Sequence, residues 1–239
     1  PDEAATLAKQ SFVNNFQSFF EIMARRDVDW RFFHERVSVP NFELGMELAR
    51  GTKPAIIATG HFGSWELMNW VLALHRTGRD GMIVMRWGKD RVMNEFLRKQ
   101  RTRKGSELVG HRNTASELLR RLRAGGVAAF LVDHNTLRQE AVFLPFLRQP
   151  AAVNMGPALL AVRARAEVWP IFMVRKPGDH YELRIDEPLD TTGLQGSLKD
   201  KVRQTAEFYT RAVEKIVREF PEQWFWMHKR WKTRPEPDE

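Results

Sequence analysis

Short apolar runs alternate along this chain with amphipathic segments. Residues 56–58, 82–85, 127–132 and 168–174 have the continuous, β-prone apolar character of buried strands. Helical spacing of apolar residues follows them at 64–75, 90–103, 114–123 and 154–165. Strands that alternate with helices predict an α/β fold. We expect a single domain whose mostly parallel or mixed central sheet is flanked by helices.

The remaining segments add detail to this prediction. A Lys-Pro-Gly-Asp turn joins 168–174 to 180–185, as in a β-hairpin, and 142–147 suits an edge strand or a loop that lines a substrate. Residues 41–50 and 198–220 have helical patterns, with Asn41 as the expected cap of the first, and Thr114 with Glu117 predicts a capping box. Residues 3–26 predict an N-terminal amphipathic helix, packed on the domain or lying on a membrane, whose apolar side chains gather on one side: Leu7, Phe12, Phe16, Phe19, Phe20 and Met23.

The candidate chemistry lies at the corner formed by residues 54–69, PAIIATGHFGSWELMN. A strand, a glycine-rich turn and a helix start follow one another here, and ligands of α/β sheets bind at the carboxyl ends of strands. On such a turn the chain can fold Glu66 back toward His61, so that the carboxylate orients the imidazole as a general base. The alternative is that His61 is a turn residue that only caps or packs.

Polar residues at two other strand ends are candidates for the same site. Arg86 follows the strand at 82–85, where it is placed to meet an anionic group or an oxyanion, or to pair with a surface carboxylate. Asp133 follows the strand at 127–132 and either binds a ligand or holds a neighbouring loop. Backbone N–H groups near Gly63 and Ser64 are further candidates for oxyanion stabilisation.

Composition and charge narrow the partners. The 239 residues include 38 Lys and Arg against 30 Asp and Glu, a net charge of +8, which favours anionic partners or serves solubility. The chain has no Cys, no metal-ligand spacing of its His residues, and neither a P-loop nor a G-x-G-x-x-G motif, so we expect no metal and no cofactor. Basic residues between 91 and 104 form a solvated face or a docking site for an acidic carrier. Tryptophans alternate with basic residues in 221–235, a mixture that suits lipid headgroups, phosphates or single-stranded nucleic acid.

The motifs in their order, TGHFGSWEL, Arg86, VAAFLVDHN, VFLPFLRQPAAVNMGPALLA, VWPIFMVRKPGDHYELRI and PEQWFWMHKRWKTRP, resemble those of the bacterial lipid A biosynthesis acyltransferases. The phosphatidylinositol mannoside acyltransferases are similar. The resemblance covers about residues 10 to 235 and implies a glycerophospholipid-acyltransferase-like fold. By this resemblance, His61 and Glu66 match the catalytic H-x4-D/E pair of the family, and Arg86 matches a family arginine near the site. Asp133 matches the aspartate of the Asp-Gln segment that follows the strand in the family.

The resemblance implies transfer of a fatty acyl chain from acyl carrier protein or acyl-coenzyme A to a hydroxyl of a lipid A-type glycolipid. Residues 27–239 would form the acyltransferase domain. The expected surroundings are an anionic membrane surface at the cytoplasmic face of the bacterial inner membrane, with peripheral attachment or an anchor outside this chain, and no nucleic acid. Two alternatives stay open: a lysophospholipid acyltransferase, and a non-catalytic basic protein that binds membranes or nucleic acid.

Overall fold

The computed structural model describes residues 2–24, 28–111 and 114–236, and its centre is one mixed sheet. In these residues the strand order is β1-β9-β8-β2-β5-β3-β4, with β10 paired to β8. Strands β2 to β5 and the β2–β8 pair run parallel, whereas β9 and β10 run antiparallel to β8. The strands are β1 Val37–Ser38, β2 Ala55–Thr59, β3 Gly81–Met85, β4 Glu107–Gly110, β5 Val127–Leu131, β8 Glu167–Lys176, β9 His180–Ile185 and β10 Leu189–Asp190. The predicted α/β class and the mostly parallel sheet are confirmed.

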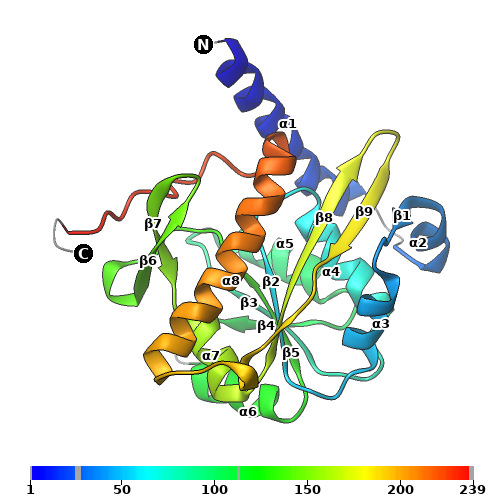
Figure 1. Cartoon of the computed structure of the whole chain (residues 1–239). Coiled ribbons are helices and arrows are strands. Elements are labelled where there is room, and N and C mark those ends of the chain that lie inside the picture. Colours follow the sequence, from blue (N-terminus) through cyan, green and yellow to red (C-terminus); the bar gives the residue numbers. More distant parts are fainter. Residues whose placement is uncertain (1, 25–27, 112–113, 237–239) are drawn as a thin grey trace.

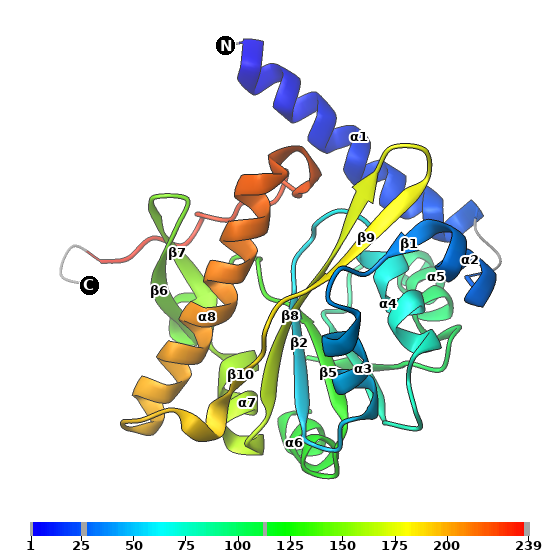
Figure 2. The same ribbon diagram turned by 45° about the vertical axis from the view of Figure 1, so that its right-hand side comes forward.

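Helices cover both faces of this sheet (Figures 1 and 2). Side chains of β2 alternate between the faces: Ile56 and Ala58 join one core cluster, and Ala55 and Ile57 join the other. Both faces are therefore buried, which is why the strands read as continuous apolar runs. The first face packs against α6 Ala115–Arg123, α7 Gly156–Ala164 and α8 Leu198–Glu219, and the second against α2 Trp30–Arg36, α3 Phe42–Arg50, α4 Trp65–Leu74 and α5 Arg91–Thr102.

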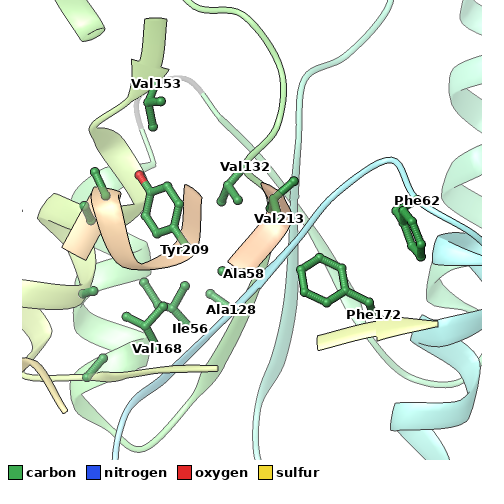
Figure 3. Packing of buried hydrophobic residues seen from close by; sticks show 14 of the residues in the cluster. Ile56, Ala58, Phe62, Ala128, Val132, Val153, Val168, Phe172, Tyr209 and Val213 are labelled. Atoms are coloured by element: carbon green, nitrogen blue, oxygen red, sulfur yellow. The ribbon is translucent and has the colours of Figure 1, made fainter. Parts of the chain in front are cut away.

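Helix α8 seals the first face with an apolar stripe. Tyr209 and Val213 point toward Ala58 of β2 and Ala128 of β5, as Figure 3 shows. Small residues in the strands let the helix approach closely. The predicted helices at 41–50 and 198–220 are confirmed as α3 and α8. The predicted capping box at Thr114 is not formed, because the Thr114 hydroxyl donates to the Gly110 carbonyl instead.

A second, two-stranded sheet lies beside α8. It consists of β6 Ala141–Phe146 and β7 Gln149–Asn154, paired antiparallel. The turn residues Leu147 and Arg148 have φ values of 50° and 66°, as two-residue hairpin turns require. The predicted strand at 142–147 is thus confirmed as β6, while its partner β7 was not expected from the sequence pattern.

Helix α1, Asp2–Ala24, packs with the face opposite to the one we expected. Its buried side chains are Ser11, Asn15, Ser18 and Ile22. Four of the six predicted apolar residues are instead about half exposed, namely Phe12 (51%), Phe16 (45%), Phe20 (60%) and Met23 (50%), whereas Leu7 and Phe19 are half-buried and Phe19 packs against Trp65. Residues 25 and 26 of the predicted helix lie outside the described residues.

Hydrogen bonds explain why small polar residues hold α1. The Ser11 hydroxyl donates to the Trp224 carbonyl at 2.6 Å, and the Ser18 hydroxyl donates to the Gly63 carbonyl at 2.6 Å. Arg175 in turn donates to the Ser18 oxygen at 3.1 Å. These short side chains let α1 approach two loops whose carbonyls would otherwise be buried without a donor.

Replacing Ser18 by Ala should lower the free energy of unfolding by about 1–3 kcal/mol, because the buried Gly63 carbonyl loses its donor. Phe20→Ser on the exposed face is the matched control and should change stability by no more than about 0.5 kcal/mol. Urea unfolding followed by circular dichroism measures both. A larger loss for Phe20→Ser than for Ser18→Ala would contradict this packing of α1.

Candidate active site

The loop between β2 and α4 places His61 at the carboxyl edge of the sheet. The loop is fixed by its neighbours: the Gly63 amide donates to the Gln223 carbonyl and the Ser64 amide to the Met173 carbonyl, both at 2.9 Å. Gly63 has φ +54°, and a Cβ there would overlap the Met173 carbonyl oxygen. Only glycine fits this turn, and the turn determines where His61 points.

Asp133, which follows β5, is the residue that orients His61. Its Oδ1 lies 2.9 Å from the imidazole Nδ1, and its Oδ2 accepts the His61 backbone N–H at 2.8 Å. The Trp224 indole N–H donates to the same Oδ2 at 2.9 Å. Strands β2 and β5 are parallel neighbours, so their carboxyl ends bring the two residues together. We call His61 and Asp133 the dyad.

The electrostatics of the dyad favour a negative Asp133 beside the imidazole. Burial of the carboxyl raises the pKa of Asp133, but attraction to His61 and the hydrogen bonds from His61 and Trp224 outweigh burial and hold that pKa well below its ordinary value. An ionised Asp133 can only accept, so Nδ1 carries the proton. The His61 side chain is 28% exposed, and its Nε2 has no partner among the described residues, which leaves a lone pair available as a base.

Glu66 does not make the hydrogen bond to His61 that the H-x4-E spacing predicted. It lies buried in the first turn of α4 and forms a two-pronged ion pair with Arg101 of α5, in which the Arg101 Nε donates at 2.9 Å. Burial raises the pKa of Glu66, but attraction to Arg101 and its hydrogen bonds, followed by attraction to His61, lower that pKa overall. The helical backbone directs Glu66 toward α5, so Asp133 occupies the expected position of its carboxylate.

The other predicted site residues are placed as follows. Arg86 comes directly after β3 at the same edge of the sheet, with an exposed side chain that contacts neither dyad residue in the described part of the chain. Ser64 is fully buried at the start of α4. The amides of Gly63 and Ser64, expected as oxyanion donors, already donate to the two backbone carbonyls named above.

The C-terminal segment after α8 forms one wall of the site, which the sequence analysis did not predict. The Phe225 amide donates to the His61 carbonyl at 2.9 Å, and a nitrogen of His228 lies 3.0 Å from the Asp133 carbonyl oxygen. Trp224 is 1% exposed, so this tryptophan of the basic and aromatic segment faces inward. Burial lowers the pKa of His228 despite its attraction to Asp133. The signal in the sequence was the indole N–H itself, because a buried tryptophan needs an acceptor.

An apolar cavity lies on the α3–α4 side of the sheet, next to the dyad. Its volume is about 140 Å³, and it is partly open to solvent. Thr59, Trp65 and Leu131 line it near the carboxyl edge, and the Trp65 ring lies 5.6 Å from the His61 ring. Gly81 and Val127 line it at the opposite, amino edge. The cavity therefore spans the length of β2, roughly 16 Å at the usual rise per residue of a strand.

Two further observations concern possible ligands. No three His, Cys, Asp or Glu side chains in the described part of the chain converge in an arrangement that could hold a metal ion. No helix within residues 2–24, 28–111 and 114–236 combines the length and the apolar character needed to cross a membrane.

The fold and the site define an α/β protein with a histidine–carboxylate dyad at a strand–helix corner, beside an apolar cavity. Residues 2–233 match the family described as bacterial lipid A biosynthesis acyltransferase, and the chain belongs to this family. It is 26% identical to the lipid A biosynthesis lauroyltransferase of Escherichia coli, over 99% of this chain and 76% of that protein. It is 25% identical to the E. coli lipid A biosynthesis palmitoleoyltransferase, over 98% and 76%, and 27% identical to a lipid A biosynthesis acyltransferase of Haemophilus influenzae, over 79% and 59%.

The Glu66–Arg101 pair should behave as a buried structural ion pair. Glu66→Leu alone should lower the free energy of unfolding by about 3–5 kcal/mol, because it leaves the Arg101 charge buried and unpaired. Adding Arg101→Met should recover part of that loss. Denaturant unfolding of both single variants and the double variant measures the coupling. Strictly additive losses would show that the two side chains do not stabilise each other.

Proposed function

We propose that the protein transfers a fatty acyl chain from an acyl thioester to a hydroxyl of a lipid A-type glycolipid, with His61 as the general base. One observation carries the proposal. The imidazole is held through Nδ1 by the buried Asp133, and its ring lies 5.6 Å from Trp65, a residue that lines the apolar cavity. The family membership supports acyl transfer as the reaction.

The proposed step balances without a protein nucleophile. Nε2 of His61 takes the proton of the acceptor hydroxyl as its oxygen attacks the thioester carbonyl carbon. The tetrahedral intermediate then expels the thiolate, which recovers the proton from the imidazolium, and an ester bond has replaced the thioester. Asp133 stabilises the imidazolium between the two transfers, as a buried carboxylate does in related dyads and triads.

Glu66 and Arg86 also have roles in this proposal, although neither contacts His61 directly. Glu66 contributes negative charge near the base, since attraction between His61 and Glu66 lowers the pKa of the carboxyl along with the stronger effect of Arg101. Arg86 is the candidate for stabilising the oxyanion or an acceptor phosphate, because the amides of Gly63 and Ser64 already donate to backbone carbonyls.

The acyl chain would occupy the apolar cavity under α3 and α4. Residues 142–146, which the sequence suggested as an edge strand or a loop that lines a substrate, belong to β6, and Phe12, Phe16 and Phe20 of α1 are exposed. The cavity instead begins near Trp65 and runs along the sheet, so a thioester carbonyl held near His61 would place its chain inside.

The donor and the membrane would approach the carboxyl edge. Arg86, Lys89 and Arg91 are exposed there at the start of α5, which suits the anionic groups of acyl carrier protein, coenzyme A or lipid headgroups. The exposed phenylalanines of α1 suit the interface of an anionic membrane. Peripheral association at the cytoplasmic face of the inner membrane is part of this proposal.

The burial of Trp224 argues against the non-catalytic alternative. Stacking on bases requires exposed rings, whereas Trp224 is buried against the dyad. A panel of glycolipid and lysophospholipid acceptors separates the remaining alternative, because each enzyme class would esterify its own acceptor.

His61→Ala should lower the rate of acyl transfer by roughly 10³-fold or more, and Asp133→Asn by roughly 10²–10⁴-fold, because each removes part of the base. Asp186→Asn, which removes one partner of the surface pair with Lys215, is the control and should stay within about twofold of the wild type. Thioester consumption and mass spectrometry of the lipid product in micelles measure the rates. An active, folded His61→Ala variant would refute the proposed mechanism.

Ala73→Phe should shift the donor preference toward shorter acyl chains. Ala73 is a small residue near the end of α4 that lines the cavity, and a phenyl ring there fills space far from His61. Ala115→Phe, on the exposed surface of α6, is the matched control. Competition among decanoyl, lauroyl, myristoyl and palmitoyl thioesters measures the preference. Equal loss with every donor, or an unchanged preference, would place the acyl chain elsewhere.

A further inference from the structure

Arg230 is a buried cation that lacks an ion-pair partner among the described residues. It is 2% exposed, and its nearest hydrogen-bond acceptors are backbone carbonyls rather than carboxylates. One terminal nitrogen donates to the Ala152 carbonyl of β7 at 2.6 Å and to the His134 carbonyl at 3.4 Å. Its Nε is buried and has no partner, and the guanidinium lies 5.4 Å above the Phe146 ring.

Such an arrangement is costly unless another charge compensates it. Arginine is rarely fully buried without a partner, because desolvation of the guanidinium disfavours folding. Burial lowers the pKa of Arg230 to about 10, and attraction to Asp133 is the strongest effect that opposes burial. The carboxylate of the dyad therefore partly offsets the burial of the Arg230 charge.

A chain of contacts links the two charges. Phe146, under the guanidinium, packs against Trp224 with ring centres 5.3 Å apart, and the Trp224 indole donates to Asp133. The His134 carbonyl that Arg230 reaches belongs to the residue after Asp133. Arg230 thus lies behind the dyad, out of direct contact with Asp133 but within the same buried region.

We propose that Arg230 is a positioning residue of the dyad: it places a positive charge in the buried region behind Asp133, and its two carbonyl contacts hold the loop of Asp133 against β7. This inference deepens the proposed function and rests on it for its kinetic test. Arg230 would then help to set the pH range of activity, although it lies outside the H-x4-E motif.

The sign of the effect follows from the charges around Asp133. A positive charge in this region makes protonation of the dyad less favourable, so its removal should move the onset of activity to higher pH. The shift should be on the order of one pH unit for a full charge in a partly buried site. Four other titratable groups face the dyad or Arg230: His134, His228, Tyr209 and Glu66. None of them is changed in the variants below.

The test compares Arg230→Gln, Arg230→Lys and the control Lys229→Met by the pH dependence of kcat/KM for acyl transfer. Arg230→Gln keeps a donor for the Ala152 carbonyl but loses the charge, and its acidic limb should move up by about one pH unit. Arg230→Lys should keep the wild-type limb, and so should Lys229→Met, since Lys229 is an exposed neighbouring cation. A lower plateau with an unmoved limb in Arg230→Gln, or an equal shift in Lys229→Met, would overturn the proposal.

A stability measurement tests the same coupling without activity. Arg230→Gln and Asp133→Asn each leave one buried charge behind, so the double variant should be less destabilised than the sum of the single variants. This double variant is also expected to fold if Arg230→Gln alone does not. Additive losses of stability would overturn the proposed coupling between Arg230 and Asp133. A wild-type protein that consumes no thioester would instead refute the proposed function, and the stability measurement would still test the coupling.

Discussion

The buried carboxylate of Asp133 is the constraint on which the site depends. Removed from water, it requires hydrogen-bond donors for its oxygens, and it receives three: the backbone and ring of His61 and the indole of Trp224. These donors come from the loop after β2 and from the C-terminal segment, while Asp133 itself follows β5. One side chain therefore joins three segments that are distant in sequence. The imidazole is oriented by the hydrogen bond that it donates to this buried carboxylate.

The sequence pattern predicted the elements well because both faces of the sheet are buried. The strands are therefore continuous apolar runs, and the helices between them have amphipathic patterns. It also located His61, Arg86 and Asp133 at strand ends. The pairing of His61 was predicted less well. Spacing along the chain suggested the local partner Glu66, whereas the partner was decided by strand order, which places β5 beside β2. Strand order depends on long-range packing that a spacing argument does not contain.

Two other differences have the same physical origin. Helix α1 was expected either to pack on the domain or to lie on a membrane, and it packs through serines and an asparagine because two loop carbonyls beneath it need donors. The aromatic C-terminal segment suited a ligand-binding surface by its composition, yet its Trp224 turns inward to an acceptor. In both segments, hydrogen bonding of buried polar groups decided the orientation, and a hydrophobic pattern does not report it.

The two buried carboxylates near His61 differ in how far their charge is neutralised. Glu66 is in direct contact with the guanidinium of Arg101, which cancels most of its field at short range. Among residues 2–24, 28–111 and 114–236, Asp133 contacts no cation except when His61 itself becomes protonated, so its charge remains available to stabilise the imidazolium. Arg230 compensates that charge from behind Phe146 and Trp224 without contacting it. A direct Arg230–Asp133 pair would satisfy the arginine better but would take the carboxylate away from the base, so the indirect arrangement preserves a charge that the reaction can use.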